Sequence, residues 1–167
     1  MTAAEIIQKL NLRPHPAEGG FFAETYRAAE QIPAAALPVC YGGPRSHNTA
    51  IYYLLSPETF SEMHRLAGDE IFHFYLGDPV EMLQLHEDGH SVLLTLGNDL
   101  QASQHVQLVV PAGVWQGTRL IEGGKVALLG CTVTPGFDFA DYRSGSFTEL
   151  SQKWPQESEQ IRVLTRS

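Results

Sequence analysis

The sequence predicts an all-β protein whose antiparallel strands pack as a sandwich or close into a barrel. Between residues 21 and 133, short apolar runs alternate with turn signals rich in glycine, proline and aspartate. At 167 residues and 43% hydrophobic content, the chain can bury one sizeable core. No repeat or linker divides it. We therefore expect a single domain over residues 1–167, with a barrel core at about 21–142.

The N-terminus is predicted to be helical. The run Thr2-Ala3-Ala4-Glu5 fits a capping box, and apolar residues follow it at helical spacing. A short amphipathic helix over residues 2–11 is therefore expected ahead of the strands.

The middle of the chain is predicted to form seven strands, bounded by turn residues. Asp88-Gly89 gives the strongest hairpin signal, because this dipeptide supplies the positive φ values that a two-residue turn needs. The expected strands are Thr49 to Leu54, Glu62 to Leu66, Glu70 to Leu76, Glu81 to His86, His90 to Leu96, Val106 to Val110 and Lys125 to Val133.

The C-terminal part is predicted to lie outside the barrel. Residues 139–150 lack a regular pattern and allow one edge strand. Residues 151–164, interrupted by Pro155, have the pattern of short helices. Helical pieces at about 148–164 are therefore expected to pack on the outer surface.

The composition excludes several classes of partner. A formal net charge of −8 argues against nucleic acid, whose binding depends on clustered Lys and Arg. We find neither a charged-then-apolar leader nor a long apolar run, so we expect no membrane association and a cytoplasmic protein. Cys40 and Cys131 lack CxxC spacing and are interpreted as reduced packing residues.

Two motifs carry the functional information. Residues 62–77 place His64 and Glu70 six positions apart across a turn, and Pro111-Ala112-Gly113-Val114-Trp115-Gln116 follows later. They resemble the two cupin motifs, G-x5-H-x-H-x3,4-E-x6-G and G-x5-P-x-G-x2-H-x3-N. From about residue 14 to 150 the chain is similar to the Cupin_5 (DUF985) family. The resemblance implies a double-stranded β-helix, or jelly roll, with short N- and C-terminal helices.

The departures from these motifs bear on metal binding. Leu66 stands where the second motif histidine is expected, and Gln116 stands where the last one is expected. Because leucine donates nothing to a metal, we expect no cofactor. The alternative is a divalent metal on a reduced ligand set of His64, Glu70 and Gln116.

His64 and Glu70 are the candidate catalytic residues. Strand alternation places Glu62, His64 and Leu66 on one face, and Glu70, Phe72 and Phe74 on one face of the next strand. By resemblance these faces point into the barrel. A buried carboxylate beside an imidazole forms a plausible proton-handling pair. The alternative is that the two side chains only hydrogen-bond to each other inside the barrel and take no part in catalysis.

Other side chains are candidate ligand contacts. We expect an aromatic mouth formed by Tyr53, Phe72, Phe74 and Trp115, each of which could instead only fill the core. Gln107 and Gln116 could orient a hydroxyl-rich ligand, or lie at the surface. His73 and Tyr75 are expected outside the barrel, as second-rank ligand contacts or at a subunit interface.

The leading hypothesis is a metal-independent cupin that binds a small polar, carbohydrate-like or carboxylated ligand. Its enzymatic version follows, by fold analogy, the dTDP-sugar 3,5-epimerases, with His64 as base and Glu70 as its orienting partner. The alternatives are a non-catalytic binding or sensory module and a metal-dependent enzyme. A homodimer is expected, because both faces of residues 70–76 carry apolar side chains.

Overall fold

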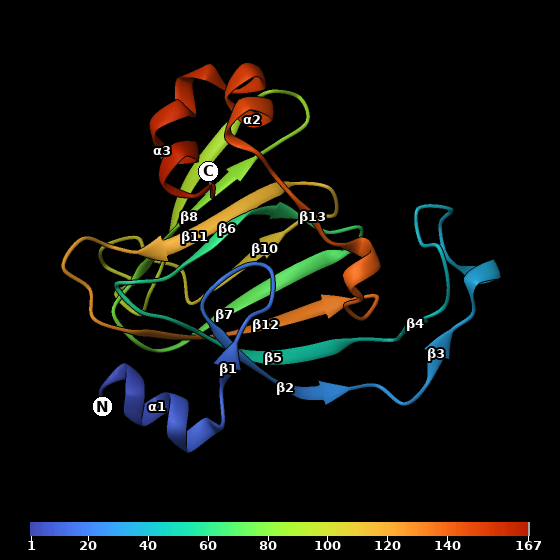
Figure 1. Ribbon diagram of the computed structural model, residues 1–167, viewed down its shortest axis with the longest axis horizontal. Coiled ribbons are helices and arrows are strands. Elements are labelled where there is room, and N and C mark those ends of the chain that lie inside the picture. Colours follow the sequence, from blue (N-terminus) through green and yellow to red (C-terminus); the bar gives the residue numbers. More distant parts are fainter. Residues whose placement is uncertain (167) are drawn as a thin grey trace.

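The computed structural model describes residues 1–166 and has two antiparallel sheets facing each other as a jelly-roll barrel (Figure 1). The first sheet has six strands. Their order is β1 (Arg13–Pro14), β2 (Phe21–Arg27), β5 (Thr49–Leu55), β12 (Ala127–Thr134), β7 (Asp69–Gly77) and β10 (Gln107–Val110).

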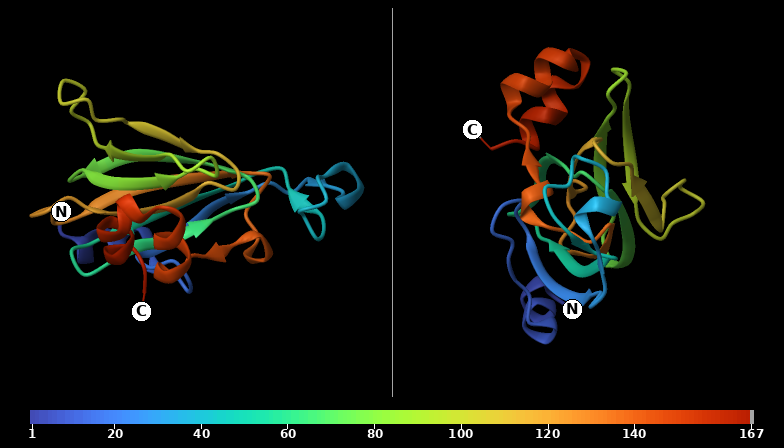
Figure 2. Two further views of the ribbon diagram at one scale, coloured as in Figure 1. Left: turned by 90° about the horizontal axis from the view of Figure 1, so that it is seen from above. Right: turned by 90° about the vertical axis from the view of Figure 1, so that its right-hand side faces the viewer.

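The second sheet has five strands. Their order is β13 (Arg143–Ser144), β6 (Phe60–Arg65), β11 (Trp115–Leu120), β8 (Val80–Leu85) and β9 (Ser91–Leu96). A separate ribbon of β3 (Gln31–Ile32) and β4 (Arg45–Ser46), with the 3₁₀ turn η1 (Ala34–Ala36), projects from the barrel as an arm (Figure 2).

Short helices cover the outer faces of the two sheets. The predicted capping box is confirmed in α1 (Ala3–Leu10), which packs on the six-stranded sheet. The C-terminal helices pack on the other sheet and bury Trp154 and Ile161 against it. They are α2 (Phe147–Lys153), η3 (Pro155–Glu157) and α3 (Ser158–Val163), preceded by η2 (Phe139–Asp141). Within residues 1–166, no helix combines the length and apolar character needed to cross a membrane.

All seven predicted strands are present, with boundaries shifted by one or two residues. The sequence analysis missed β2 and β11, as well as the two-residue strands β1, β3 and β4. The omission of β11 matters more, because this strand lies in the middle of its sheet and carries Gln116. Gly117 and its polar neighbours interrupt the apolar pattern by which strands are recognised.

The predicted hairpin at Asp88-Gly89 is confirmed, but its loop is longer than expected. His86 donates its backbone N–H to His90, so three residues rather than two lie between the paired positions. Gly89 alone among them has a positive φ, of 94°. This matches a three-residue loop that ends in a left-handed glycine.

Strict alternation along β6 is also wrong, because the strand contains a bulge. Gln116 pairs with His64, whereas Thr118 pairs with Ser61, so β6 has one residue more than β11 over this stretch. As a result Ser61 and His64 both approach Glu18, while Met63 packs against the C-terminal helices.

The barrel interior is divided between hydrocarbon and a cavity. At one end, Leu55, Val80 and Leu120 belong to the main hydrophobic cluster and fill the space between the sheets. At the other end, Thr49, Ile51 and Glu70 line a cavity instead. The polar residues that β6 and β7 contribute are therefore placed where a small molecule can approach them.

Candidate active site

A cavity of about 360 Å³ opens at the end of the barrel away from the filled core. Its walls come from β2, β5, β7 and β12 and from the loops around residues 15–18 and 137–139. The lining residues are Arg13, His15, Glu18, Phe22, Glu24, Arg27, Thr49, Ile51, Leu66, Glu70, Cys131, Val133, Phe137, Asp138 and Phe139. Its volume falls at the lower end of small-molecule sites, which span roughly 300–1,000 Å³.

At the inner end of this cavity, two carboxylates flank one imidazole. The His64 Nε2 atom lies 3.7 Å from Glu18 Oε2 and 3.9 Å from Glu70 Oε2. The three side chains are only 1%, 7% and 8% exposed, respectively. Since both carboxylates also line the cavity, they stand between His64 and any bound ligand.

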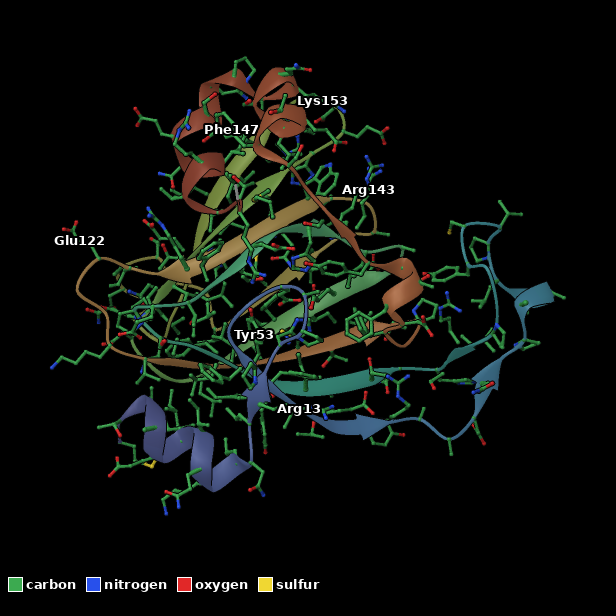
Figure 3. The ribbon with its side chains drawn as sticks, viewed as in Figure 1. Arg13, Tyr53, Glu122, Arg143, Phe147 and Lys153 are labelled. Carbon is green, nitrogen blue, oxygen red and sulfur yellow. The ribbon has the colours of Figure 1, made fainter. Side chains whose placement is uncertain are left out.

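Glu18 comes from the loop between β1 and β2, which reaches from the six-stranded sheet to β6 of the other sheet (Figure 3). Its carbonyl accepts the Glu62 backbone N–H at 2.8 Å, and its carboxylate accepts the Ser61 hydroxyl at 3.2 Å. The Tyr53 hydroxyl donates to the Gly19 carbonyl at 2.8 Å. These contacts fix the loop from both sheets and hold Glu18 in place.

The environment of His64 favours the protonated ring. Its Nδ1 lies 2.7 Å from the Glu62 carbonyl, an acceptor, so Nδ1 carries a proton. Burial alone would lower the pKa of His64. The negative charge of Glu18, together with the hydrogen bond and charge of Glu70, outweighs burial and raises the pKa to about 9.

The Gln116 amide joins His64 and Glu70. Its Nε2 atom lies 2.8 Å from His64 Nε2 and 3.1 Å from Glu70 Oε2, an arrangement that suits a neutral ring. The buried Oε1 atom has no hydrogen-bond partner within residues 1–166. A half-turn of the amide lets Oε1 accept from a protonated His64 and removes the amide donor from Glu70. Because its pKa is raised, we favour the protonated ring and the turned amide.

Tyr142 covers the other side of His64. The two rings stack with their centroids 5.0 Å apart, and the Tyr142 hydroxyl donates to Glu62 Oε1 at 2.9 Å. Ser144 donates to the same oxygen, and Arg166 pairs with Oε2 at 3.3 Å. Burial and the charges of Glu18 and Glu62 raise the pKa of Tyr142, so the phenol stays protonated.

His15 is a second imidazole on the cavity wall. Its Nδ1 accepts the Glu18 backbone N–H at 2.9 Å, so its proton is on Nε2, which lies 3.9 Å from Glu18 Oε2. Burial lowers the pKa of His15 despite the charge of Glu18. At neutral pH this ring is therefore a neutral N–H donor.

The donors present do not fit the metal ion typical of cupins. Leu66 presents hydrocarbon to the cavity, and the Gln116 amide occupies the position facing His64 Nε2. Within residues 1–166, no group of three or more His, Cys, Asp or Glu side chains has the arrangement of a metal site.

The predicted aromatic mouth is formed by other residues. Tyr53 and Phe72 are fully buried in the main core, and Phe74 packs against it. The placement of Trp115 was wrong. Because Trp115 and Gln116 point to opposite faces of β11, Trp115 packs outside the barrel with Trp154. The aromatic residues at the cavity are Phe22, Phe137 and Phe139.

The second-rank candidates lie on the outer face of the six-stranded sheet. His73 approaches Gln107 at 3.1 Å and Thr132 at 3.2 Å, and its ring stacks on Tyr75. Tyr75 is 51% exposed. None of these residues lines the cavity. The position of Gln107 on the outer face therefore does not support the expectation that this side chain orients a ligand inside the barrel.

Sequence reasoning missed His15 and Glu18 as site residues. It assigned no role to the Glu18-Gly19-Gly20 run. The available signal was the adjacent glycines, whose φ values are 100° and 66°. Such residues allow close backbone approach, which carries the preceding side chain deep into the barrel.

Comparisons with known proteins agree with this architecture. A hypothetical protein from Leishmania major has 28% identity, with full coverage of both chains and a TM-score of 0.88. A Shewanella oneidensis protein has 32% identity over 99% of this chain and 98% of its own, with a TM-score of 0.86. Oxalate decarboxylase from Bacillus subtilis shares the fold alone, at 15% identity and a TM-score of 0.54, over 92% of this chain and 37% of that one.

No match was found among curated proteins. Residues 4–144 match the family described as Cupin superfamily (DUF985). This match covers most of the sequence, including both cupin motifs and the loop that carries Glu18. The chain therefore belongs to the DUF985 family of the cupin superfamily.

Proposed function

We propose that this cupin binds a small hydroxylated carbonyl compound and moves a proton at the carbon next to the carbonyl, as an epimerase or isomerase does. The observation that carries the proposal is the meeting of Glu18, Glu70 and His64 at the inner end of the cavity. Ionisable groups held this close together in a buried pocket are typical of acid–base catalysis.

The roles differ from those expected from the sequence. A ring with a pKa of about 9 already holds its proton at neutral pH, so His64 is a poor base. Glu70 lines the cavity and is the proton acceptor in this proposal. The positive charge on His64 lies between the two carboxylates and offsets part of their mutual repulsion. His15, with its Nε2 proton, is the donor that faces the ligand oxygen.

The proposed step conserves protons and electrons. Glu70 takes the proton from the carbon beside the carbonyl, and the C–H electron pair moves to the carbonyl oxygen as an enolate forms. The His15 N–H stabilises the charge on that oxygen. Return of a proton to the opposite face of the same carbon gives an epimer. Return to the former carbonyl carbon gives the isomeric carbonyl compound, when the proton of the neighbouring hydroxyl moves to the former carbonyl oxygen.

Deuterium exchange tests the proposal. We expect the protein in D₂O to exchange the C–H next to the carbonyl of at least one hexose, pentose, sugar acid or sugar phosphate, as monitored by proton NMR. The Glu70→Gln substitution should slow exchange by at least about 100-fold, because general acid–base groups contribute about 10²–10⁴-fold.

The matched control is Glu81→Gln, which removes a carboxylate paired with Arg119 on the surface and should leave exchange unchanged. Binding of each compound is followed separately by thermal shift. If compounds stabilise the protein and none of them exchanges its C–H, the result contradicts the enzyme and favours a non-catalytic binding module.

The outer face of the six-stranded sheet suggests a partner surface. We further propose that the protein forms a homodimer through this face, where Tyr75 and Val109 are each 51% exposed. These apolar side chains lie on neighbouring strands, β7 and β10. Covering them removes apolar surface from water, which favours association.

A further inference from the structure

The mouth of the cavity contains two arginines in very different states. Arg27 donates twice to Glu24, at 3.1 and 2.7 Å, and twice to the Phe137 carbonyl, at 3.2 Å. Arg13 lies on the same wall but makes no side-chain hydrogen bond or ion pair within residues 1–166. The Arg13 guanidinium is therefore the group whose donors are available to a ligand.

The fold holds Arg13 in position despite this lack of polar partners. Its backbone pairs with Phe22 in the short β1–β2 ladder, and the preceding Leu12 is buried. The guanidinium carbon lies 5.1 Å from the centroid of the Phe22 ring, at cation–π distance. This contact uses the face of the guanidinium and leaves its planar fork of N–H donors unused.

The charges along the cavity define a direction. Glu18 and Glu70 make the inner end negative, so it favours ligand hydroxyl groups and repels a carboxylate or phosphate. At the outer end, Arg27 is paired with Glu24 and Asp138 caps η2, so within residues 1–166 Arg13 is the cation there without a carboxylate partner. An anionic ligand would therefore enter with its hydroxylated carbonyl end first and its anionic group at the mouth.

We propose that Arg13 is a specificity-determining residue that recognises the anionic group, carboxylate or phosphate, of a monosaccharide-sized ligand. This inference rests on the proposed function and names its substrate class. Guanidinium matches either anion through paired hydrogen bonds. A cavity of about 360 Å³ suits a sugar acid or a sugar phosphate better than a sugar nucleotide.

The test uses sets of ligands that share a sugar ring and differ in charge. Glucose, glucuronate and glucose 6-phosphate form one set, and ribose and ribose 5-phosphate form another. Calorimetry of the whole protein should give at least tenfold tighter binding for a charged member than for its neutral parent. Whether the acid or the phosphate binds more tightly identifies the anion.

Substitution then tests the residue. Arg13→Gln should weaken binding of the charged ligand by about tenfold or more and leave the neutral parent unchanged. The matched control is Arg162→Gln, because Arg162 also stacks on a phenylalanine ring, at 4.1 Å from the Phe147 centroid, but lies outside the cavity. This control should bind like the native protein.

The outcomes separate the two proposals. Equal binding of neutral and charged members, or an Arg13→Gln protein that still prefers the charged ligand, overturns the role of Arg13 alone. Failure of every member of both sets to bind overturns the carbohydrate-like ligand class on which that role depends. A charge preference lost only in Arg13→Gln supports both.

Discussion

At the scale of single residues, the protonation state of His64 organises the site. The carboxylates of Glu18 and Glu70 raise its pKa from 6.5 to about 9 against the opposing effect of burial. A protonated ring neutralises part of the charge that two buried carboxylates would otherwise carry without compensation. The same proton sets the orientation of the Gln116 amide, whose Oε1 has a partner only when the ring is charged.

This shift predicts how stability depends on pH. Because the pKa of His64 is higher in the folded than in the unfolded state, its contribution is complete below pH 6.5 and is lost as pH rises toward 9. The free energy of unfolding should fall by roughly 3 kcal/mol over this range, at about 1.4 kcal/mol per pKa unit. Urea denaturation at several pH values measures the fall.

The comparison with His64→Gln isolates the histidine from other titrating groups. The difference in unfolding free energy between the native protein and this variant should shrink as pH rises from 6.5 to 9. A difference that stays constant or grows with pH would contradict a raised pKa at His64.

The sequence predicted part of the site and missed another part for a physical reason. His64, Glu70 and Gln116 were identifiable because cupin motifs fix their positions on paired strands, where register determines which side chains meet. Glu18 reaches them from a loop far away in sequence, through a backbone path that alternation rules do not describe. Trp115 was misplaced because β11 itself was not recognised.

At the scale of elements, the loop between β1 and β2 is the part on which the site most depends. Gly19 has a φ of 100°, and a Cβ there would overlap the Phe60 carbonyl oxygen. The conformation therefore excludes a side chain for both backbone and steric reasons. No adjustment of a flexible side chain relieves a clash with backbone.

Gly19→Ala should lower the free energy of unfolding by at least about 2 kcal/mol and weaken ligand binding, because Glu18 moves with the loop. Chemical denaturation and calorimetry measure the two effects. Gly42→Ala is the matched control, since its Cβ meets nothing within 4 Å and its φ is not positive. Equal stability of the two variants would show that the loop tolerates displacement.

The apolar content of each strand explains why some strands were predicted and others were missed. Strands such as β7 and β8 carry enough apolar residues to be recognised, whereas β11 has Gly117 at its centre. That glycine accommodates the β6 bulge, because a Cβ there would lie 2.7 Å from Met63 Sδ. Glycine leaves room for Met63 at this position, and the same glycine weakens the apolar pattern by which a strand is recognised.

At the scale of the whole molecule, the residues that stabilise the barrel and the residues of the candidate site lie at different ends of it. One end is filled by a hydrophobic cluster, and the other holds the cavity with its charged centre. Helices cover part of each outer face, as the ribbon views show (Figures 1 and 2). The exposed apolar side chains on β7 and β10 lie outside this helical cover and form the surface for the proposed homodimer.

The homodimer predicts a mass in solution of twice 18.4 kDa. Val109→Lys places a charge on the proposed interface and should shift the protein toward the monomer, because burying an unpaired ammonium is costly. Multi-angle light scattering at micromolar concentration measures both. A native protein that is monomeric at this concentration would contradict the proposal.

At the inner end of the cavity, Glu18 and Glu70 enclose a protonated His64, and the candidate site is built on this arrangement. NMR titration of the histidine ring resonances tests it most directly, with His64 assigned by its absence in His64→Gln. We expect a His64 pKa near 9, and a lower pKa in Glu18→Gln because this substitution removes the charge that raises it most. A His64 ring that titrates at or below 6.5, unchanged by Glu18→Gln, would contradict it.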